Sequence, residues 1–237
     1  MEPSGPGRKQ GRNRRTGVSR IYDDAMELAE RWAGLAGPET RRLGDELIAR
    51  YGEPHRRYHT RTHLAAVLDL VDEFSADAED ADAVRLAAWF HDAVYDPERG
   101  DNEDRSARLA ERMLTDTDLP LETIAEVARL VRLTATHDPA PADRNGRVLC
   151  DADLAILAAE PAEYAAYAAA VREEYAFVPD ELFATARADV LESLLALPEL
   201  FRTETARERF EDRARHNVET ELTLLRAGAS GGAAPTP

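Results

Sequence analysis

The dipeptide His91-Asp92 lies inside the apolar run Leu-Ala-Ala-Trp-Phe-His-Asp-Ala-Val-Tyr, residues 86–95. A run of this composition is expected to be buried, and an unpaired buried carboxylate is very costly. The fold must therefore supply a partner. Asp92 could pair with an arginine while His91 packs in the core, or both residues could bind a divalent metal ion. The dipeptide alone favours the first interpretation, and the other polar residues along the chain favour the second.

Apolar residues recur at helical spacing through almost all of the chain between its two ends, which predicts a helical structure. No strand-like alternation of useful length and no internal repeat is present. Breaker residues fill 138–146, where we expect a loop with a turn at Asn145-Gly146, a possible lip over a functional site. The fold class that follows is all-α, a single-domain helical bundle. The expected helices are 22–35, 39–51, 62–75, 81–95, 102–115, 121–136, 151–159, 161–176, 180–196 and 203–226.

Three segments are expected along the chain. Residues 1–20 contain six Arg and Lys against one acidic residue together with Gly, Pro and Ser, which predicts a disordered basic tail. Residues 21–226 form the helical domain. Residues 227–237 are rich in Gly, Ala and Pro and predict a second disordered tail.

The charge balance excludes several classes of partner. With 46 Asp and Glu against 30 Lys and Arg, the chain is acidic, which argues against general nucleic-acid binding. An anionic substrate would have to be attracted by local positive charge, such as a metal ion and a few arginines.

Cys150 is the single cysteine, so no disulfide is expected and a cytoplasmic location fits. The sequence shows no membrane span and no secretory signal.

Histidine and aspartate recur at three places with helical context. His59 and His63 stand four residues apart, and apolar spacing begins after His63, so His59 lies just before a helix or in its first turn. His91-Asp92 follows, and then Asp151 and Asp153 come at the start of a further apolar segment. Each of these groups lies at or inside an apolar helical segment, as residues that share one buried site would.

Four ordered blocks appear along the chain: Tyr58 to Leu64 (YHTRTHL), Phe90 to Pro97 (FHDAVYDP), Asp101 to Ala107 (DNEDRSA) and Asp151 to Leu157 (DADLAIL). Together they resemble the HD superfamily of metal-dependent phosphohydrolases, and more closely a bacterial branch of it. The resemblance spans roughly residues 20 to 225 and implies an HD-type helical bundle. It also implies an enzyme in which a metal-activated water cleaves a phosphomonoester or phosphoanhydride of a nucleotide or related small molecule.

The resemblance assigns metal ligands to His63, His91, Asp92 and one carboxylate of the last block. The family's block order favours Asp151 over Asp153. The two aspartates lie about 200° apart on a helix, so both cannot readily face one ion. Such a nitrogen and oxygen set suits manganese, iron, cobalt, nickel or zinc better than magnesium.

Further roles follow from the resemblance and from position. The residues expected to be catalytic are Asp92 and Glu103, and Glu103 is the candidate general base. The alternative for Glu103 is that it belongs to an acidic first turn that stabilises a helix. Arg57 and Arg61, which flank His59, could bind phosphate, although exposed arginines also form ion pairs with acidic surfaces.

His59 and His137 are secondary candidates for substrate binding. HD proteins with two metals generally have two more histidines between the His-Asp pair and the final Asp. Only His137 lies there, so we expect one ion. His137 is then either a hydrogen-bond donor to the phosphate of the substrate or a loop residue at the end of its helix.

Two other functions remain open at this point. A di-iron HD-type oxygenase is disfavoured by the histidine count. A non-catalytic nucleotide-sensing HD module is disfavoured by the intact ligand set, because decayed modules commonly lose ligands.

Overall fold

The computed structural model describes residues 17–231, and within that range every regular element is a helix. This confirms the all-α fold class. Three short 3₁₀ helices, η1 (Pro38–Thr40), η2 (Ser75–Asp77) and η3 (Ala155–Ala158), supplement the α-helices. The α-helices are α1 (Gly17–Ala36), α2 (Arg41–Arg50), α3 (Arg61–Glu73), α4 (Ala81–Phe90), α5 (Asn102–Leu114), α6 (Leu121–Leu133), α7 (Arg144–Leu154), α8 (Pro161–Glu174), α9 (Asp180–Leu195) and α10 (Glu204–Gly231).

The helical part differs at both ends from the expected 21–226. Helix α1 begins at Gly17, and α10 continues to Gly231. The remaining parts of the two expected disordered tails, residues 1–16 and 232–237, lie outside the described residues.

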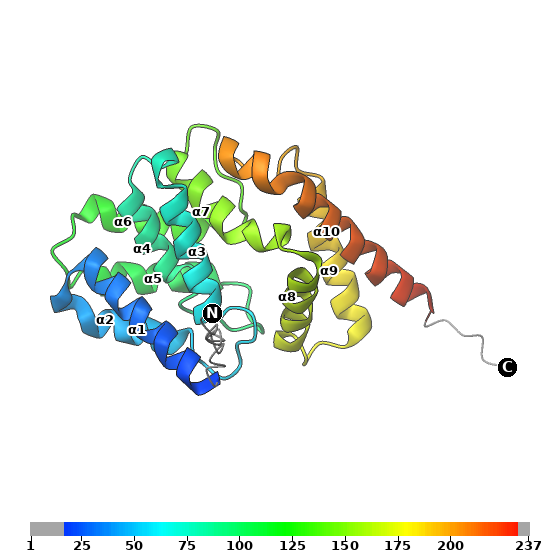
Figure 1. The fold of residues 1–237 in the computed structure, drawn as a ribbon, viewed down its shortest axis with the longest axis horizontal. Helices are drawn as coiled ribbons and strands as arrows, with labels where there is room; N and C mark the ends of the chain where they lie inside the picture. The colour runs from blue at the N-terminus through cyan, green and yellow to red at the C-terminus, as the bar shows by residue number, and fades with distance from the viewer. Residues whose placement is uncertain (1–16, 232–237) are drawn as a thin grey trace, which may run out of the picture.

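The helices form two groups joined by α7 (Figure 1). Helices α1 to α7 make the larger group, in which α5 packs on α6 and α4 packs on both α3 and α6. Helices α8 to α10 make the smaller group, where α10 packs along α9 and over η3. Because η3 continues directly from α7, the last block of the motif passes from one group into the other. Side chains near the end of α7 can therefore meet residues from both.

The core behind the motif residues is built on aromatic packing. Trp32 of α1 and Trp89 of α4 are fully buried, with ring centroids 5.3 Å apart in an edge-to-face arrangement. Thr40 accepts a hydrogen bond of 2.9 Å from the Trp32 indole nitrogen, so the buried polar atom is satisfied. Helix α4 is thereby fixed in the core, and the residue that follows it has a fixed position.

Helix α4 is shorter than the 81–95 we expected. It ends at Phe90, and His91 is its C-cap, with Asp92 in the turn that follows. The backbone N–H of Asp92 donates to the hydroxyl oxygen of Tyr51, and the guanidinium of Arg56 donates to the Asp92 carbonyl. These partners replace the helical hydrogen bonds. The dipeptide therefore lies at a helix end, and not in a helix wall.

The expected loop at 138–146 is also shorter. Asp143 is the N-cap of α7, and its carboxylate accepts a 2.9 Å hydrogen bond from the N–H of Gly146. Asn145 and Gly146 are thus in the first turn of a helix, and the turn we expected there is wrong. A Cβ at position 146 would meet the carboxylate of Asp143 and the side chain of Leu133, so any residue larger than glycine would require both side chains to shift. Asn145 instead holds the segment that precedes α4, because its side-chain oxygen accepts hydrogen bonds from the N–H groups of residues 79 and 80.

Two further expectations concern membranes and the cysteine. Among the described helices, none is long and apolar enough to cross a membrane. Cys150 lies buried in α7 without a disulfide, and burial raises the pKa of its thiol, which keeps it neutral and poorly nucleophilic.

Candidate metal centre

Four side chains from three separate segments meet in the core. His63 comes from the first turn of α3, His91 and Asp92 follow α4, and Asp153 comes from α7. We call these four residues the central cluster. The imidazole nitrogens Nε2 of His63 and His91 are 3.1 Å apart. Oδ1 of Asp153 lies 3.2 Å from His63 Nε2, and Oδ2 of Asp92 lies 3.1 Å from His91 Nε2.

The arrangement fits a metal ion. His63, His91 and Asp153 offer ligand atoms that all lie within 4.8 Å of one another. Nδ1 of His91 is 2.7 Å from the carbonyl oxygen of Ala88, so Nδ1–H donates there and the lone pair of neutral His91 is on Nε2. Two nitrogens that bind one ion at about 2.1 Å and at right angles are separated by about 3 Å. The 3.1 Å separation of the two nitrogens therefore fits a shared ion, and so does this tautomer of His91.

Charge is concentrated in this buried site. Burial alone lowers the pKa of His91, but the neighbouring Asp92 and Asp153 outweigh it and raise that pKa to about 9. Burial alone would raise the pKa of Asp92, but His91, His59 and His63 hold it well below its usual range. The two carboxylates are thus negative and need compensation, by protons on the imidazoles or by a cation. A divalent ion would supply that charge and leave both histidines neutral.

The position of Asp151 differs from the one we expected. Asp151 is fully buried, but Oδ1 accepts a 2.7 Å hydrogen bond from the N–H of Arg202, and Oδ2 accepts one of 2.7 Å from Thr203. Its carboxylate thus holds the segment before α10 and does not reach the central cluster. Asp153, on the other side of α7, is the aspartate in the cluster. The angular argument that only one of the pair can face the site agrees with this geometry, whereas the preference for Asp151 does not.

His137 contacts the central cluster at Asp153. Its Nε2 is 2.8 Å from Oδ2 of Asp153, the oxygen that does not face the other histidines. The backbone of His137 has a φ of 50°, in the left-handed region that residues other than glycine rarely adopt. This conformation follows the end of α6, where the N–H of His137 bonds the carbonyl of Leu133. His137 thus positions the carboxylate of Asp153.

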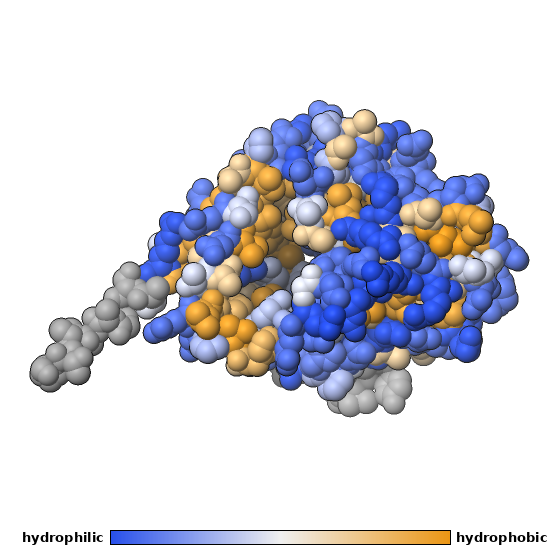
Figure 2. All heavy atoms as spheres, turned by 180° about the vertical axis from the view of Figure 1, so that it is seen from behind, coloured by the Kyte–Doolittle hydropathy of each residue, from blue (hydrophilic) through white to orange (hydrophobic). Residues whose placement is uncertain are grey.

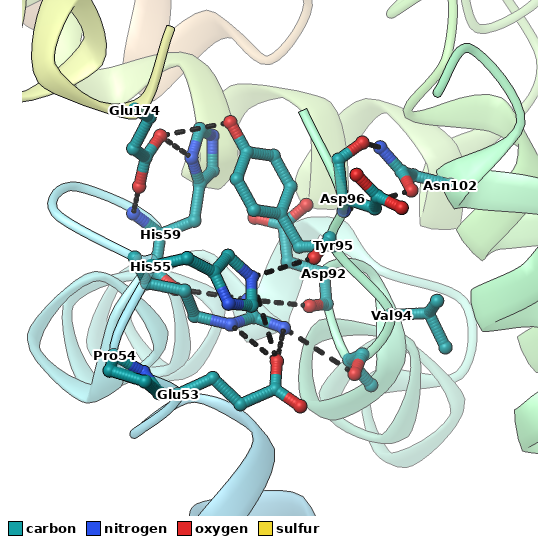
Figure 3. A network of polar contacts seen from close by, with 12 residues as sticks. Glu53, Pro54, His55, His59, Asp92, Val94, Tyr95, Asp96, Asn102 and Glu174 are labelled. Atoms are coloured by element: carbon teal, nitrogen blue, oxygen red, sulfur yellow. Dashed lines mark hydrogen bonds and ion pairs between the residues drawn. The ribbon is translucent and has the colours of Figure 1, made fainter. Parts of the chain in front are cut away.

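His59 precedes α3 and is joined to α8 by Glu174 (Figure 3). Oε2 of Glu174 lies 2.7 Å from His59 Nδ1 and accepts a 2.9 Å hydrogen bond from the Tyr95 hydroxyl. Oε1 accepts three backbone hydrogen bonds, from the N–H groups of Arg57, Tyr58 and His59. Burial raises the pKa of Glu174, but His59 and these donors outweigh it and lower the pKa to about 2. Nothing in the sequence of α8 marks Glu174 as part of this site, so Glu174 is a functional residue that the motifs do not predict.

Arg56, which directly precedes Arg57, is a further residue of the site that the motif spacing does not indicate. Its side chain is fully buried, and its guanidinium donates a 2.8 Å hydrogen bond to the Asp92 carbonyl and a 3.0 Å hydrogen bond to the His59 carbonyl. Glu53 balances its charge at 3.2 Å. Arg56 thus fixes the two motif loops relative to each other, and no residue spacing could have revealed it.

Arg57 and Arg61 have protein partners. Arg57 donates to the Pro54 carbonyl at 2.6 Å and lies 3.4 Å from a carboxylate oxygen of Glu173. Arg61 donates from Nε to the Ile48 carbonyl at 2.8 Å, against the end of α2. Arg61 thus supports α2, whereas Arg57 also borders the groove described below, so phosphate binding stays a prediction for it.

Glu103 lies in the first turn of α5. Its charge contributes to raising the pKa of Tyr175, after the larger effect of burial on that tyrosine. Among the described residues, Glu103 shares no hydrogen bond or ion pair with the central cluster. Its role as a general base therefore stays a prediction.

A groove of about 620 Å³ reaches the cluster between α3, α7 with η3, and α8. His63 and Asp153 are part of its lining, together with mostly apolar side chains. Figure 2 shows a hollow with hydrophobic residues where the two groups of helices meet. The central cluster is thus buried in the core but accessible from one side.

No protein-family model matches this chain, and no curated protein and no solved structure matches it. The class that the fold and the site define is an all-α protein with a buried histidine and aspartate group that could hold a metal ion.

Proposed function

We propose that the protein is a metal-dependent phosphohydrolase that cleaves a phosphomonoester or phosphoanhydride of a small molecule. The observation that carries this proposal is the meeting of His63, His91, Asp92 and Asp153 at the inner end of an open groove. The four motif blocks that resemble the HD superfamily support it, and by that resemblance a nucleotide is among the candidate substrates.

The donor set suits a transition metal. Two imidazole nitrogens with carboxylate oxygens favour manganese, iron, cobalt, nickel or zinc over magnesium. When bound, such an ion would acidify a water molecule and neutralise phosphoryl charge.

The residues of the chain have defined tasks in this proposal. Ala88 and His137 orient His91 and Asp153, so that the ligand atoms are already placed before an ion binds. The nearly complete burial of His63 and His91 excludes bulk water on the core side. The groove side stays open for a substrate. Glu103 is the candidate to take a proton from the attacking water.

The test combines metal analysis with activity. We expect about one equivalent of a transition metal per chain and metal-dependent hydrolysis across a panel of phosphate esters. His91→Ala and Asp92→Ala should each abolish turnover while helical content stays the same. His216→Ala, which changes an exposed histidine of α10, is the control and should behave as wild type. Full activity of the His91→Ala variant after chelation and metal restoration would refute the proposal.

A further inference from the structure

The groove beside the central cluster has the size of a small-molecule site. Its volume of about 620 Å³ falls within the roughly 300–1,000 Å³ that such sites occupy. It is open to solvent along α8 and reaches His63 and Asp153 at its inner end. A molecule that places a phosphate at the cluster must therefore place the rest of its structure along this groove.

The walls of the groove are apolar on both sides. Helix α3 contributes Val67 and Leu70, η3 contributes Ile156, and α8 contributes Ala166 and Ala170 one turn apart. The alanine side chains of α8 are short and leave space between the helices. The longer side chains of Val67, Leu70 and Ile156 line that space. When a ligand covers apolar area that is in contact with water, the free energy falls in proportion to the area covered.

The two arginines that line the groove have protein partners. Arg57 pairs with Glu173 at 3.4 Å, and Arg213 pairs with Glu160 at 2.5 Å. The hydroxyl of Tyr167 accepts a 3.1 Å hydrogen bond from Arg187, whose guanidinium carbon also lies 5.4 Å from the centroid of the Tyr167 ring. A second or third phosphate would therefore have to draw an arginine out of an existing ion pair.

We propose that the groove binds the hydrocarbon part of a phosphomonoester with a single phosphate, such as an alkyl phosphate. This inference rests on the proposed function and narrows its substrate class away from nucleotides. In the reaction, the bond between phosphorus and the alcohol oxygen breaks and the oxygen of water joins the phosphorus. The released alkoxide takes a proton that the water has lost. The alcohol product leaves along the apolar walls.

A chain-length series tests the inference. We expect kcat/KM for ethyl, butyl and hexyl phosphate to rise by about fourfold for each methylene that the groove buries. Glycerol 3-phosphate and adenosine monophosphate should be poorer substrates than hexyl phosphate. Equal rates along the series, or faster hydrolysis of adenosine monophosphate, would overturn the inference.

A pair of alanine variants locates the effect. Ala170→Leu fills the groove, so kcat/KM for hexyl phosphate should fall more than kcat/KM for ethyl phosphate, which flattens the dependence on chain length. Ala169→Leu changes the adjacent, exposed position on α8, which does not line the groove, and should behave as wild type. The same effect in both variants would refute the assignment.

Binding of phosphonates separates this inference from the proposed function. Ethyl- and hexylphosphonate carry a carbon–phosphorus bond that hydrolysis does not cleave, and their affinities for the metal-loaded protein can be measured by calorimetry. Tighter binding of hexylphosphonate without hydrolysis of any ester would keep the groove assignment and refute the enzyme. Ester hydrolysis without a chain-length effect on rate or binding would keep the proposed enzyme and refute the groove assignment.

Discussion

Nδ1 of His59 lies 2.7 Å from Oε2 of Glu174, although 115 residues separate them along the chain. The contact joins the loop before α3 to the end of α8, and so connects the two groups of helices next to the central cluster. With Nδ1 occupied by Glu174, Nε2 is the nitrogen left for other contacts. His59 is close enough to Asp92 for its charge to lower the pKa of that carboxyl, so Glu174 orients a group that acts on the cluster.

Glu174→Gln should destabilise the protein by about 1–3 kcal/mol, the range for a buried hydrogen-bonding group that loses its matched partner. The amide keeps one acceptor for the backbone N–H groups but replaces the charged acceptor that faces His59 and Tyr95. Denaturant unfolding measures the difference. Glu173→Gln, at the exposed neighbouring position, is the control and should stay within about 0.5 kcal/mol of wild type. Equal effects of the two substitutions would contradict the role of Glu174.

The contribution of Glu174 should depend on pH with a definite sign. Its pKa in the folded protein is lowered to about 2 from an ordinary value of 4.5, so the unfolded chain binds the proton more readily. The stability that the carboxylate provides is present above pH 4.5 and is lost as the pH falls towards 2. The difference in unfolding free energy between wild type and Glu174→Gln should therefore shrink across that interval. A difference that stays constant from pH 6 to pH 3 would be inconsistent with this.

The two aspartates of α7 should separate by experiment. Asp153→Asn should lower metal content and leave the fold intact, because its carboxylate faces the histidines. Asp151→Asn should keep metal binding but cost about 1–3 kcal/mol, because one carboxylate oxygen that accepts a backbone N–H becomes a donor. Metal analysis and thermal unfolding of the same preparations distinguish the two. Loss of metal in Asp151→Asn with an unchanged thermal midpoint would reverse the assignment.

The sequence was sufficient for the fold class and for most of the cluster. Apolar spacing predicted nine of the ten α-helices within the described residues, whereas the expected helix 151–159 covers only the end of α7 together with η3. The motif residues His63, His91 and Asp92 meet because each lies at a helix end or in a first turn that the core fixes. These features depend on local periodicity, which the sequence displays directly.

The rest depends on contacts between distant segments. Asp151 does not face the cluster because its carboxylate binds the backbone N–H groups of residues 202 and 203, which lie 51 and 52 residues further along the chain. Arg56 and Glu174 act on carbonyl and N–H groups of other loops, and such groups have no signature in the sequence. The shortening of α4 has the same origin, since Tyr51 and Arg56 bond the backbone that would have continued the helix.

His137→Gly should separate backbone strain from ligand positioning. Glycine adopts positive φ without penalty, so this change should be neutral or should stabilise the protein by up to about 1 kcal/mol. The same change removes the hydrogen bond to Asp153, and metal affinity should fall by about 10–100-fold, as is typical for the partner of a ligand. Competition with a chelator measures the affinity. An unchanged affinity would remove His137 from the site.

Glu103→Gln tests the last predicted role. If Glu103 takes a proton from the attacking water, the substitution should keep metal content and phosphonate binding while turnover falls by about 10²–10⁴-fold. If Glu103 only stabilises the first turn of α5, the same change should cost a few tenths of a kcal/mol in stability and leave turnover near wild type. Glu98→Gln, in the turn before α5, is the matched control for loss of one negative charge nearby. Turnover of Glu103→Gln equal to that of Glu98→Gln would place Glu103 outside the reaction, because a proton acceptor cannot be replaced by an amide without loss of rate.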